Sequence, residues 1–224
     1  MREVLSQIVR WWESGRTFGL ATVVNTFHSA PRPPGASMAV FGEEAEGSVS
    51  GGCVEGAVYE LAREVVASGT PVLRRYGVSD DDAFSVGLTC GGILDVFVEP
   101  VSRETFPELG EVAGSVRGRE PVAVATVLSG PGAVGARRVI WPERSSGSLG
   151  VARLDEAVDD DARGMLAQGS TGIRRYGARG ERRLDDLSVF VHSFAPPPRM
   201  LVFGAIDFAA AVARIGKFLG YHVV

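Results

Sequence analysis

The chain repeats a long stretch of its own sequence. Residues 47–77 read GSVSGGCVEGAVYELAREVVASGTPVLRRYG, and residues 147–177 read GSLGVARLDEAVDDDARGMLAQGSTGIRRYG. The two stretches align without a gap at a shift of 100 residues. A repeat of this kind is typical of one supersecondary unit that occurs twice and packs against its own copy. It limits the chain to folds with internal pseudo-symmetry, in which two related halves lie together.

Shorter matches extend the repeat to whole α/β halves. ATVV at 21–24 returns as ATVL at 125–128, and VFV at 96–98 returns at 189–191. In the first copy, apolar residues recur at helical spacing over 54–68, and Gly69 is typical of the residue that follows a helix. LATVVN and ILDVFVEP are β-branched runs bounded by polar or turn residues, which favours buried strands. Each copy therefore predicts the order strand, loop, strand, turn, helix, strand, strand.

The repeats also predict the domain organisation. We expect one mixed α+β domain over 1–194, made of two pseudo-symmetric repeats at about 17–100 and 121–194. A helix at about 104–117 would connect the two repeats. The fold class predicted from this pattern is α/β.

The C-terminal residues differ from both copies. The proline-rich stretch 195–198 is a stiff linker, and a short apolar strand follows it at 199–204. A helical pattern over 206–219 and a strand beginning at Tyr221 complete the order of a dinucleotide-binding βαβ unit. We therefore expect 199–224 to be the start of a Rossmann-like domain, and the chain to be part of a longer protein.

The dinucleotide fingerprint in this segment is incomplete. GxGxxG needs small residues where Ile206 and Ala209 stand, and only Gly204 fits fully. Asp207 adds a negative charge near the helix end that would meet the pyrophosphate. NAD(P) binding is thus open to doubt on sequence grounds.

Composition narrows the range of partners. Hydrophobic residues make up 45% of the chain and charged residues 22%, which is ordinary for a soluble globular protein. A net charge of −4 without a Lys/Arg-rich run argues against nucleic acid or an acidic membrane surface as the main partner. No apolar stretch is long enough to cross a bilayer, and two cysteines do not make a disulfide framework. We expect a cytoplasmic protein.

The second copy serves as an internal control for function. Arg74, Arg75, Tyr76 and Gly77 recur at 174–177, so the shared fold is a sufficient reason for them. The GGC stretch Gly51, Gly52 and Cys53 is replaced by Val151, Ala152 and Arg153. Nothing in the second copy matches the segment Thr89, Cys90, Gly91 and Gly92. Because the second copy repeats the fold without these residues, the fold does not require them. They are therefore candidates for function.

The two cysteine segments suggest a binding pocket. A thiolate at the start of a helix is stabilised by unpaired N–H groups and by the helix dipole, which favours a reactive Cys53. Gly51 and Gly52 allow close approach to the main chain and an anion-binding turn. Gly91 and Gly92, after Cys90, offer a second such place. The alternative is that both cysteines are small buried apolar residues.

Other polar residues have weaker claims. Arg32, in a loop stiffened by Pro31, Pro33 and Pro34, could hold a phosphate or carboxylate, or it could be a solvated turn residue. A turn residue is the favoured interpretation of His28. Zinc held by Cys53, Cys90 and His28 lacks the usual tight ligand spacing. Glu55 is typical of the negative charge found at the start of a helix. The run of aspartates at 80–82 is typical of a solvated loop.

Together these segments resemble the XdhC/CoxI family, the xanthine dehydrogenase accessory factors. The resemblance is carried by SAPRPPGASM at 29–38, GSVSGGCVEGAV at 47–58 and LTCGGILDVFVEP at 88–100, and more weakly by VFGAIDFAAAV after the proline linker. It covers essentially the whole chain, and GGC at the helix start is similar to the CoxI-like branch. GAID stands where the family's Rossmann-like domain has a GAGH-like turn.

The resemblance implies a chaperone for molybdenum cofactor (molybdopterin). Such a protein binds the cofactor, shelters it during sulfuration by a cysteine desulfurase, and passes it to an apo-molybdoenzyme such as xanthine or carbon monoxide dehydrogenase. The resemblance implies that Cys53 and Cys90 contact the molybdenum or a transferable sulfur, and that the glycine pairs contact the pterin or its phosphate. It also implies that Arg32 faces an anionic part of the cofactor.

Three functions remain open from the sequence. A binding and transfer protein without catalytic residues leads, since no compact nucleophile–base–acid set stands out. The alternative is an NAD(P)-dependent oxidoreductase that uses the C-terminal segment, and the third is an interaction module with inert cysteines. An unfinished sheet with exposed strand edges favours a homodimer.

Overall fold

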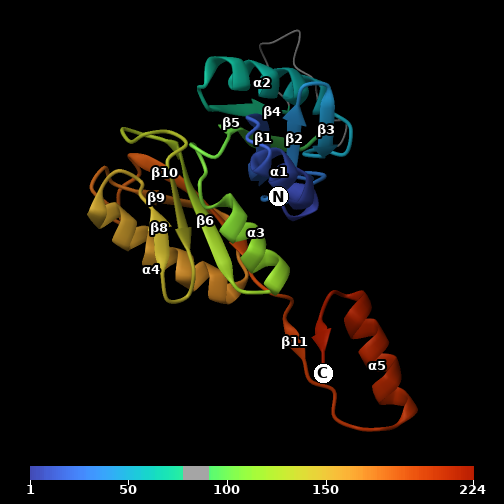
Figure 1. Ribbon diagram of the computed structural model, residues 1–224. Coiled ribbons are helices and arrows are strands. Elements are labelled where there is room, and N and C mark those ends of the chain that lie inside the picture. The colour runs from blue at the N-terminus through green and yellow to red at the C-terminus, as the bar shows by residue number, and fades with distance from the viewer. Residues whose placement is uncertain (78–90) are drawn as a thin grey trace.

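The first repeat is a five-stranded antiparallel sheet covered by one helix. In this computed structural model, which describes residues 1–77 and 91–224, the strand order is β3-β2-β1-β5-β4 and α2 covers one face (Figure 1). The elements are β1 (Phe18–Phe27), β2 (Ser37–Phe41), β3 (Glu44–Gly47), α2 (Glu55–Ser68), β4 (Val72–Tyr76) and β5 (Ile93–Val101). Strand β3 is one more than the sequence predicted, because the segment after the turn pairs back onto β2.

The second repeat has the same architecture. Its sheet has the order β8-β7-β6-β10-β9, and α4 covers the corresponding face. The elements are β6 (Val122–Ser129), β7 (Arg137–Ile140), β8 (Ser145–Gly147), α4 (Ala152–Gln168), β9 (Gly172–Tyr176) and β10 (Leu187–Phe194). Both repeat helices end in a left-handed glycine, Gly69 at φ 72° and Gly169 at φ 65°. The predicted α/β fold with two similar repeats is confirmed.

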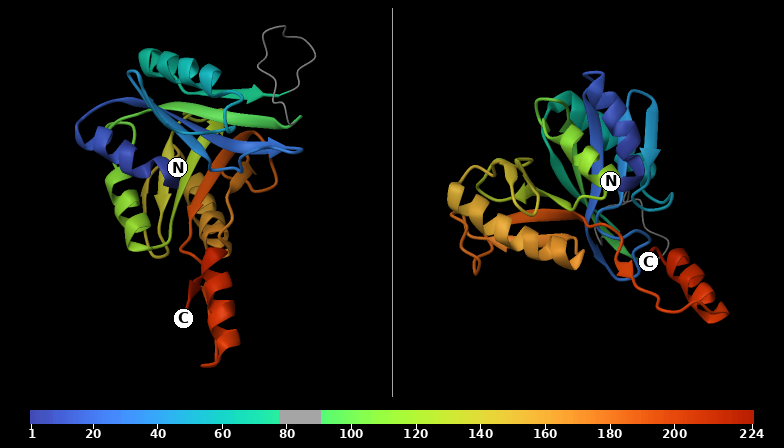
Figure 2. Two further views of the ribbon diagram at one scale, coloured as in Figure 1. Left: turned by 90° about the vertical axis from the view of Figure 1, so that its right-hand side faces the viewer. Right: turned by 60° about the horizontal axis from the view of Figure 1, so that its bottom comes forward.

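The two sheets pack against each other through the faces that the helices leave open. In β1, Ala21 and Val23 pack under α2, whereas Thr22 and Val24 line the space between the sheets. A bulge in β1 leaves Val24 without a partner in β5. A matching bulge in β6 leaves Leu128 without a partner in β10. Both bulged residues pack with Phe97 and Phe190 in one cluster. Figures 1 and 2 show α2 and α4 on the outer sides of the two sheets.

Three further helices, one of them a short 3₁₀ helix, close one side of this sandwich. The N-terminal helices η1 (Arg2–Val4) and α1 (Leu5–Glu13) share a core with α3 (Leu109–Gly118), which connects the repeats. The helix expected from 104 begins only at Leu109. Pro107 disfavours helical backbone at Phe106, and Ser102 and Thr105 instead cap each other's backbone N–H groups in a turn.

A buried ion pair crosses the space between the sheets. Glu99 of β5 and Arg137 of β7 lie 2.5 Å apart, with side chains 7% and 6% exposed. Burial raises the pKa of Glu99, and the Arg137 guanidinium acts against that rise. The pair therefore joins one repeat to the other through charges that water does not screen.

The C-terminal segment stands apart from the two repeats (Figures 1 and 2). Strands β11 (Arg199–Met200) and β12 (His222–Val223) pair in parallel, with α5 (Asp207–Phe218) between them. This is the predicted βαβ order, although β11 is shorter than the strand expected at 199–204. The side chains of Phe203 and Phe218 are both 90% exposed. A Rossmann-like domain stays a prediction.

No helix in the described part of the chain is long and apolar enough to cross a membrane.

Candidate functional site

Three segments that the sequence singled out meet at one end of the first sheet. Strand β1 ends at Phe27, opposite the start of β5 at Ile93, so the loop after β1 lies beside Gly91 and Gly92. The turn before α2 lies at this end too, since Ser48 donates its N–H to the carbonyl of Ser37 at the start of β2. Ala30 and Cys53 pack against the same core from these loops. Cys90, Thr89 and the acidic run at 80–82 lie outside the described residues.

The turn before α2 is closed by a carboxylate of the chain itself. Glu55, the first residue of α2, accepts hydrogen bonds from the backbone N–H groups of residues 49–52 at 2.8–3.2 Å. The hydroxyls of Ser48 and Ser50 also donate to it. Burial favours the neutral acid, but the hydrogen bonds from Ser48 and Ser50 outweigh it and lower the pKa of Glu55 to about 2. The predicted anion-binding turn therefore exists, but Glu55 occupies it.

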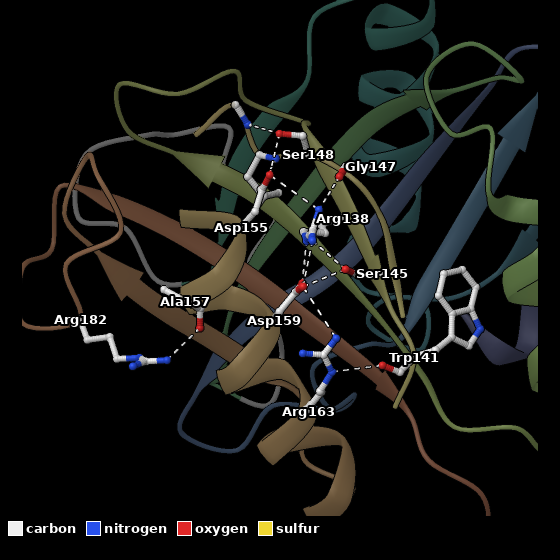
Figure 3. Close-up of polar contacts among 12 residues, drawn as sticks. Arg138, Trp141, Ser145, Gly147, Ser148, Asp155, Ala157, Asp159, Arg163 and Arg182 are labelled. Atoms are coloured by element: carbon white, nitrogen blue, oxygen red, sulfur yellow. Dashed lines mark hydrogen bonds and ion pairs between the residues drawn. The ribbon is translucent and has the colours of Figure 1, made fainter. Parts of the chain in front are cut away.

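The second repeat uses the same device with a different residue. Asp155 accepts hydrogen bonds from Ser148 Oγ at 2.8 Å and from the Leu149 N–H at 2.7 Å (Figure 3). Arg138 lies 3.7 Å from Asp155 and makes two hydrogen bonds to Asp159, at 2.6 and 2.9 Å. Because both repeats hold a carboxylate at this point, Glu55 has a structural role that the fold requires.

The GGC stretch itself lies at the surface. Gly51 and Gly52 are exposed, have φ angles of 79° and 115°, and would have no neighbour within 4 Å of an added Cβ. They are glycines because of their left-handed backbone, since no neighbour excludes a side chain there. Cys53 is half-buried and donates its N–H to Ser50 Oγ at 2.9 Å. A ligand can thus reach the main chain of both glycines beside the cysteine.

Gly92 has a different reason to be glycine. A Cβ there would lie 2.9 Å from the carbonyl oxygen of Ser29 and 3.0 Å from Ala30 Cα, whereas one on Gly91 would meet nothing within 4 Å. Gly91 has a φ of 70°. Gly92 therefore lets two candidate loops touch through their backbones, and Gly91 supplies a left-handed turn.

We expect Gly92→Ala to reduce the free energy of unfolding by about 1–3 kcal/mol, because the two backbones must move apart. Gly91→Asn is the matched control, since asparagine tolerates a left-handed backbone, and it should lose less than about 1 kcal/mol. Urea unfolding followed by circular dichroism measures both. Equal losses would contradict the role given to the Ser29 contact.

Arg32 belongs to the loop after β1, but its side chain lines a hollow that the glycine-cysteine residues do not line. Its Nη2 donates to the carboxylate of Glu3, and it lines a hollow between the repeats together with residues such as Thr171 and Ser193. Neither the GGC stretch nor Gly91 and Gly92 line that hollow. That Arg32 faces an anionic part of the cofactor stays a prediction. Thr171 and Ser193 were not predicted from the sequence, although a signal was present: the first copy has Pro71 and Pro100 at the corresponding positions.

His28 lies in a turn, as the favoured interpretation of the sequence predicted. His28 is exposed and has a φ of 57°, and its carbonyl accepts the N–H of Ala30, so it forms a turn. Within residues 1–77 and 91–224, no three His, Cys, Asp or Glu side chains gather as a metal site would require. The zinc hypothesis that included Cys90 reaches beyond these residues.

Comparison with known protein families gives one match in each repeat. The model of the XdhC and CoxI family matches residues 11–77 and 110–177, one segment in each repeat. A search of curated protein sequences gave no match. A crystal structure of a xanthine dehydrogenase (BH1974) from Bacillus halodurans is similar in fold, with a TM-score of 0.62 and 21% sequence identity. The alignment covers 98% of this chain but 60% of that protein, so the chain spans about 60% of its length.

Proposed function

Because the chain belongs to the XdhC and CoxI family, we propose that it is an accessory protein of a xanthine dehydrogenase or carbon monoxide dehydrogenase system. In this role it binds molybdenum cofactor, assists its sulfuration by a cysteine desulfurase, and hands it to the apo-molybdoenzyme. Family membership supports the accessory role. The cofactor, the desulfurase and the recipient enzyme are the finer part of the proposal.

The observation that carries the finer part is the meeting of loops at one end of the first sheet. Cys53 and the exposed glycines beside it lie at the end where Gly92 touches the loop after β1. The second repeat builds the same scaffold with Val151, Ala152 and Arg153 in place of the GGC stretch. The fold therefore needs no cysteine at this position, and a ligand is a better reason for it.

These residues fit one part of the cofactor better than another. The open main chain of Gly51 and Gly52 suits the flat face of a pterin, and the Cys53 thiol suits a soft metal or a sulfur. The N–H groups of the turn are already taken by Glu55, so they are not the site of a phosphate. When bound, the cofactor would supply the molybdenum centre, and this end of the sheet would hold and orient it.

The test is retention of molybdenum and pterin after incubation with cofactor released from a molybdoenzyme. We expect the unaltered protein to retain both in stoichiometric amounts after gel filtration, and the Cys53→Ser, Cys90→Ser double variant to lose them. Arg153→Ser is the matched control, because Arg153 occupies the position of Cys53 in the second repeat, and it should retain both. Full retention by the double variant would rule out the cysteine site. If neither the unaltered protein nor any variant retains molybdenum and pterin, cofactor binding is ruled out.

The NAD(P)-dependent oxidoreductase rests on the C-terminal segment alone. The parallel pairing of β11 with β12 around α5 is in its favour. Against it, Asp207 is the first residue of α5, where a pyrophosphate would need positive potential. Saturable NAD(H) binding with turnover of a small substrate would establish it over the accessory role.

A further inference from the structure

The hollow that contains Arg32 lies where the two repeats meet at their loops. Its volume is about 480 Å³. Residues from three parts of the chain line it: Arg2 and Glu3 of η1, Arg32 and its neighbouring prolines in the loop after β1, and Thr171, His192 and Ser193 of the second repeat. Among these side chains two are guanidinium groups and one is a carboxylate, so the charge of the lining favours an anion.

Two of the lining side chains have buried polar atoms without a partner. Arg32 Nε and Ser193 Oγ are shielded from water and make no hydrogen bond within the part of the chain that the structure describes. Buried donors of this kind are uncommon, since each one lost from water without a replacement costs about 1–3 kcal/mol. An acceptor bound in the hollow would offer both atoms a partner.

The hydroxyl groups can serve as donors. Thr171 Oγ1 accepts the N–H of Ser193 at 3.1 Å, so its own O–H remains to donate. Arg32 offers Nε–H beside the Nη2 group that now contacts Glu3. Two neighbouring donors of a guanidinium match two oxygens of a phosphate or carboxylate. Serine and threonine hydroxyls on the other wall add donors for a third oxygen, which favours a tetrahedral oxyanion.

The internal repeat shows that the scaffold does not require these polar residues. At the corresponding positions of the other loop, Gly132 stands for Arg32, Pro71 for Thr171 and Pro100 for Ser193. The loop after β6 does meet the first repeat there, since a Cβ on Gly135 would lie 3.0 Å from Pro71, so the corresponding junction forms without these donors. Packing is a sufficient reason for glycine and proline at these positions. It is not a sufficient reason for Arg32, Thr171 and Ser193.

We propose that this hollow binds the phosphate group of a free phosphate or a phosphate monoester, with Arg32 as its main ligand. The phosphate replaces the carboxylate of Glu3 on the guanidinium, and Thr171 and Ser193 donate from the opposite wall. Glu3 is 59% exposed and can turn into solvent when displaced. It acts as a built-in competitor that keeps Arg32 in place while the hollow is empty. The proposal is independent of cofactor binding at the glycine-cysteine end.

The experiment is a titration with inorganic phosphate at low ionic strength, followed by ³¹P NMR and calorimetry. We expect saturable binding to one site. Glu3→Gln removes the competitor and should tighten binding about twofold to fivefold, since a partly exposed ion pair is worth about 0.5–1 kcal/mol. Arg32→Lys keeps the charge but loses the paired donors, and should weaken binding about tenfold or more. Arg10→Lys on α1 is the matched control and should change nothing.

The remaining arms identify the ligand and separate this proposal from the accessory function. Phenyl phosphate that binds more tightly than phosphate identifies a monoester, and the reverse order identifies the free ion. Acetate should compete poorly. The Cys53→Ser, Cys90→Ser variant should bind phosphate as the unaltered protein does, whatever its molybdenum retention. Absence of saturable binding, binding unchanged in Arg32→Lys, or binding weakened in Glu3→Gln would each overturn the proposal.

Discussion

Replacement of Arg137 by methionine is expected to reduce the free energy of unfolding by about 3–5 kcal/mol. Methionine fills much of the space of the arginine stem, but it leaves the Glu99 carboxylate buried between the two sheets without its cation. Burial already raises the pKa of Glu99, and Arg137 is the group that opposes this rise. The variant must either bury an uncompensated charge or take up a proton, and both reduce stability. Urea unfolding at pH 7, followed by circular dichroism, measures the loss.

Two further variants separate the ion pair from the general effect of losing an arginine. Arg144→Met removes an exposed ion pair to Glu111 at 3.1 Å, and should lose less than about 1 kcal/mol. The double variant Glu99→Met, Arg137→Met removes both buried charges and should recover most of the loss, because well-packed apolar residues often replace a buried pair without penalty. If Arg137→Met is as stable as Arg144→Met, the pair does not hold the repeats together.

The repeat made the overall fold predictable. A gapless alignment over 47–77 and 147–177 requires the same helix and strands twice, and the helical spacing over 54–68 placed α2 to within one residue. Gly69 and Gly169 follow their helices with left-handed backbone, as the sequence indicated for the first. These features depend on local periodicity and on glycine, which a sequence displays directly.

The packing of the sheets on each other was beyond the sequence. The bulges at Val24 and Leu128 direct these residues toward the opposite sheet, but in the sequence they are single members of apolar runs. Glu99 likewise looks like the polar end of a strand. Its partner is in the other repeat, and nothing in the spacing of Glu99 and Arg137 indicates that they meet.

The candidate site was predictable in its members but not in its arrangement. The loss of the GGC stretch from the second copy pointed to Cys53 and its glycines, and the structure places them beside the loop that Gly92 contacts. Arg32 lines a hollow with residues of the other repeat instead, because the proline-rich loop between β1 and β2 lies where the two repeats meet. A usable signal for Glu55 was present: each copy places a serine seven residues before a carboxylate, Ser48 with Glu55 and Ser148 with Asp155.

Replacement of Glu55 by glutamine is expected to reduce the free energy of unfolding by about 2 kcal/mol at pH 7. The carboxylate accepts from four backbone N–H groups and two serine hydroxyls, and hydrogen bonds to a charged acceptor are stronger than those to a neutral one. An amide offers one acceptor oxygen, and its NH₂ group would face donors. Glu60→Gln on the exposed side of α2 is the matched control, and should change stability by less than about 0.5 kcal/mol.

The dependence of this loss on pH identifies its cause. The pKa of Glu55 is lowered from 4.5 to about 2 in the folded protein, so the unfolded chain binds the proton more readily than the folded one. The contribution of the carboxylate is therefore complete above pH 4.5 and disappears as the pH falls toward 2. The difference in stability between the unaltered protein and Glu55→Gln should shrink over this interval, whereas the difference for Glu60→Gln should stay small throughout. A difference that stays constant down to pH 2 would mean that the ionised carboxylate does not hold the turn, and would leave its hydrogen-bonded N–H groups open to an anionic ligand.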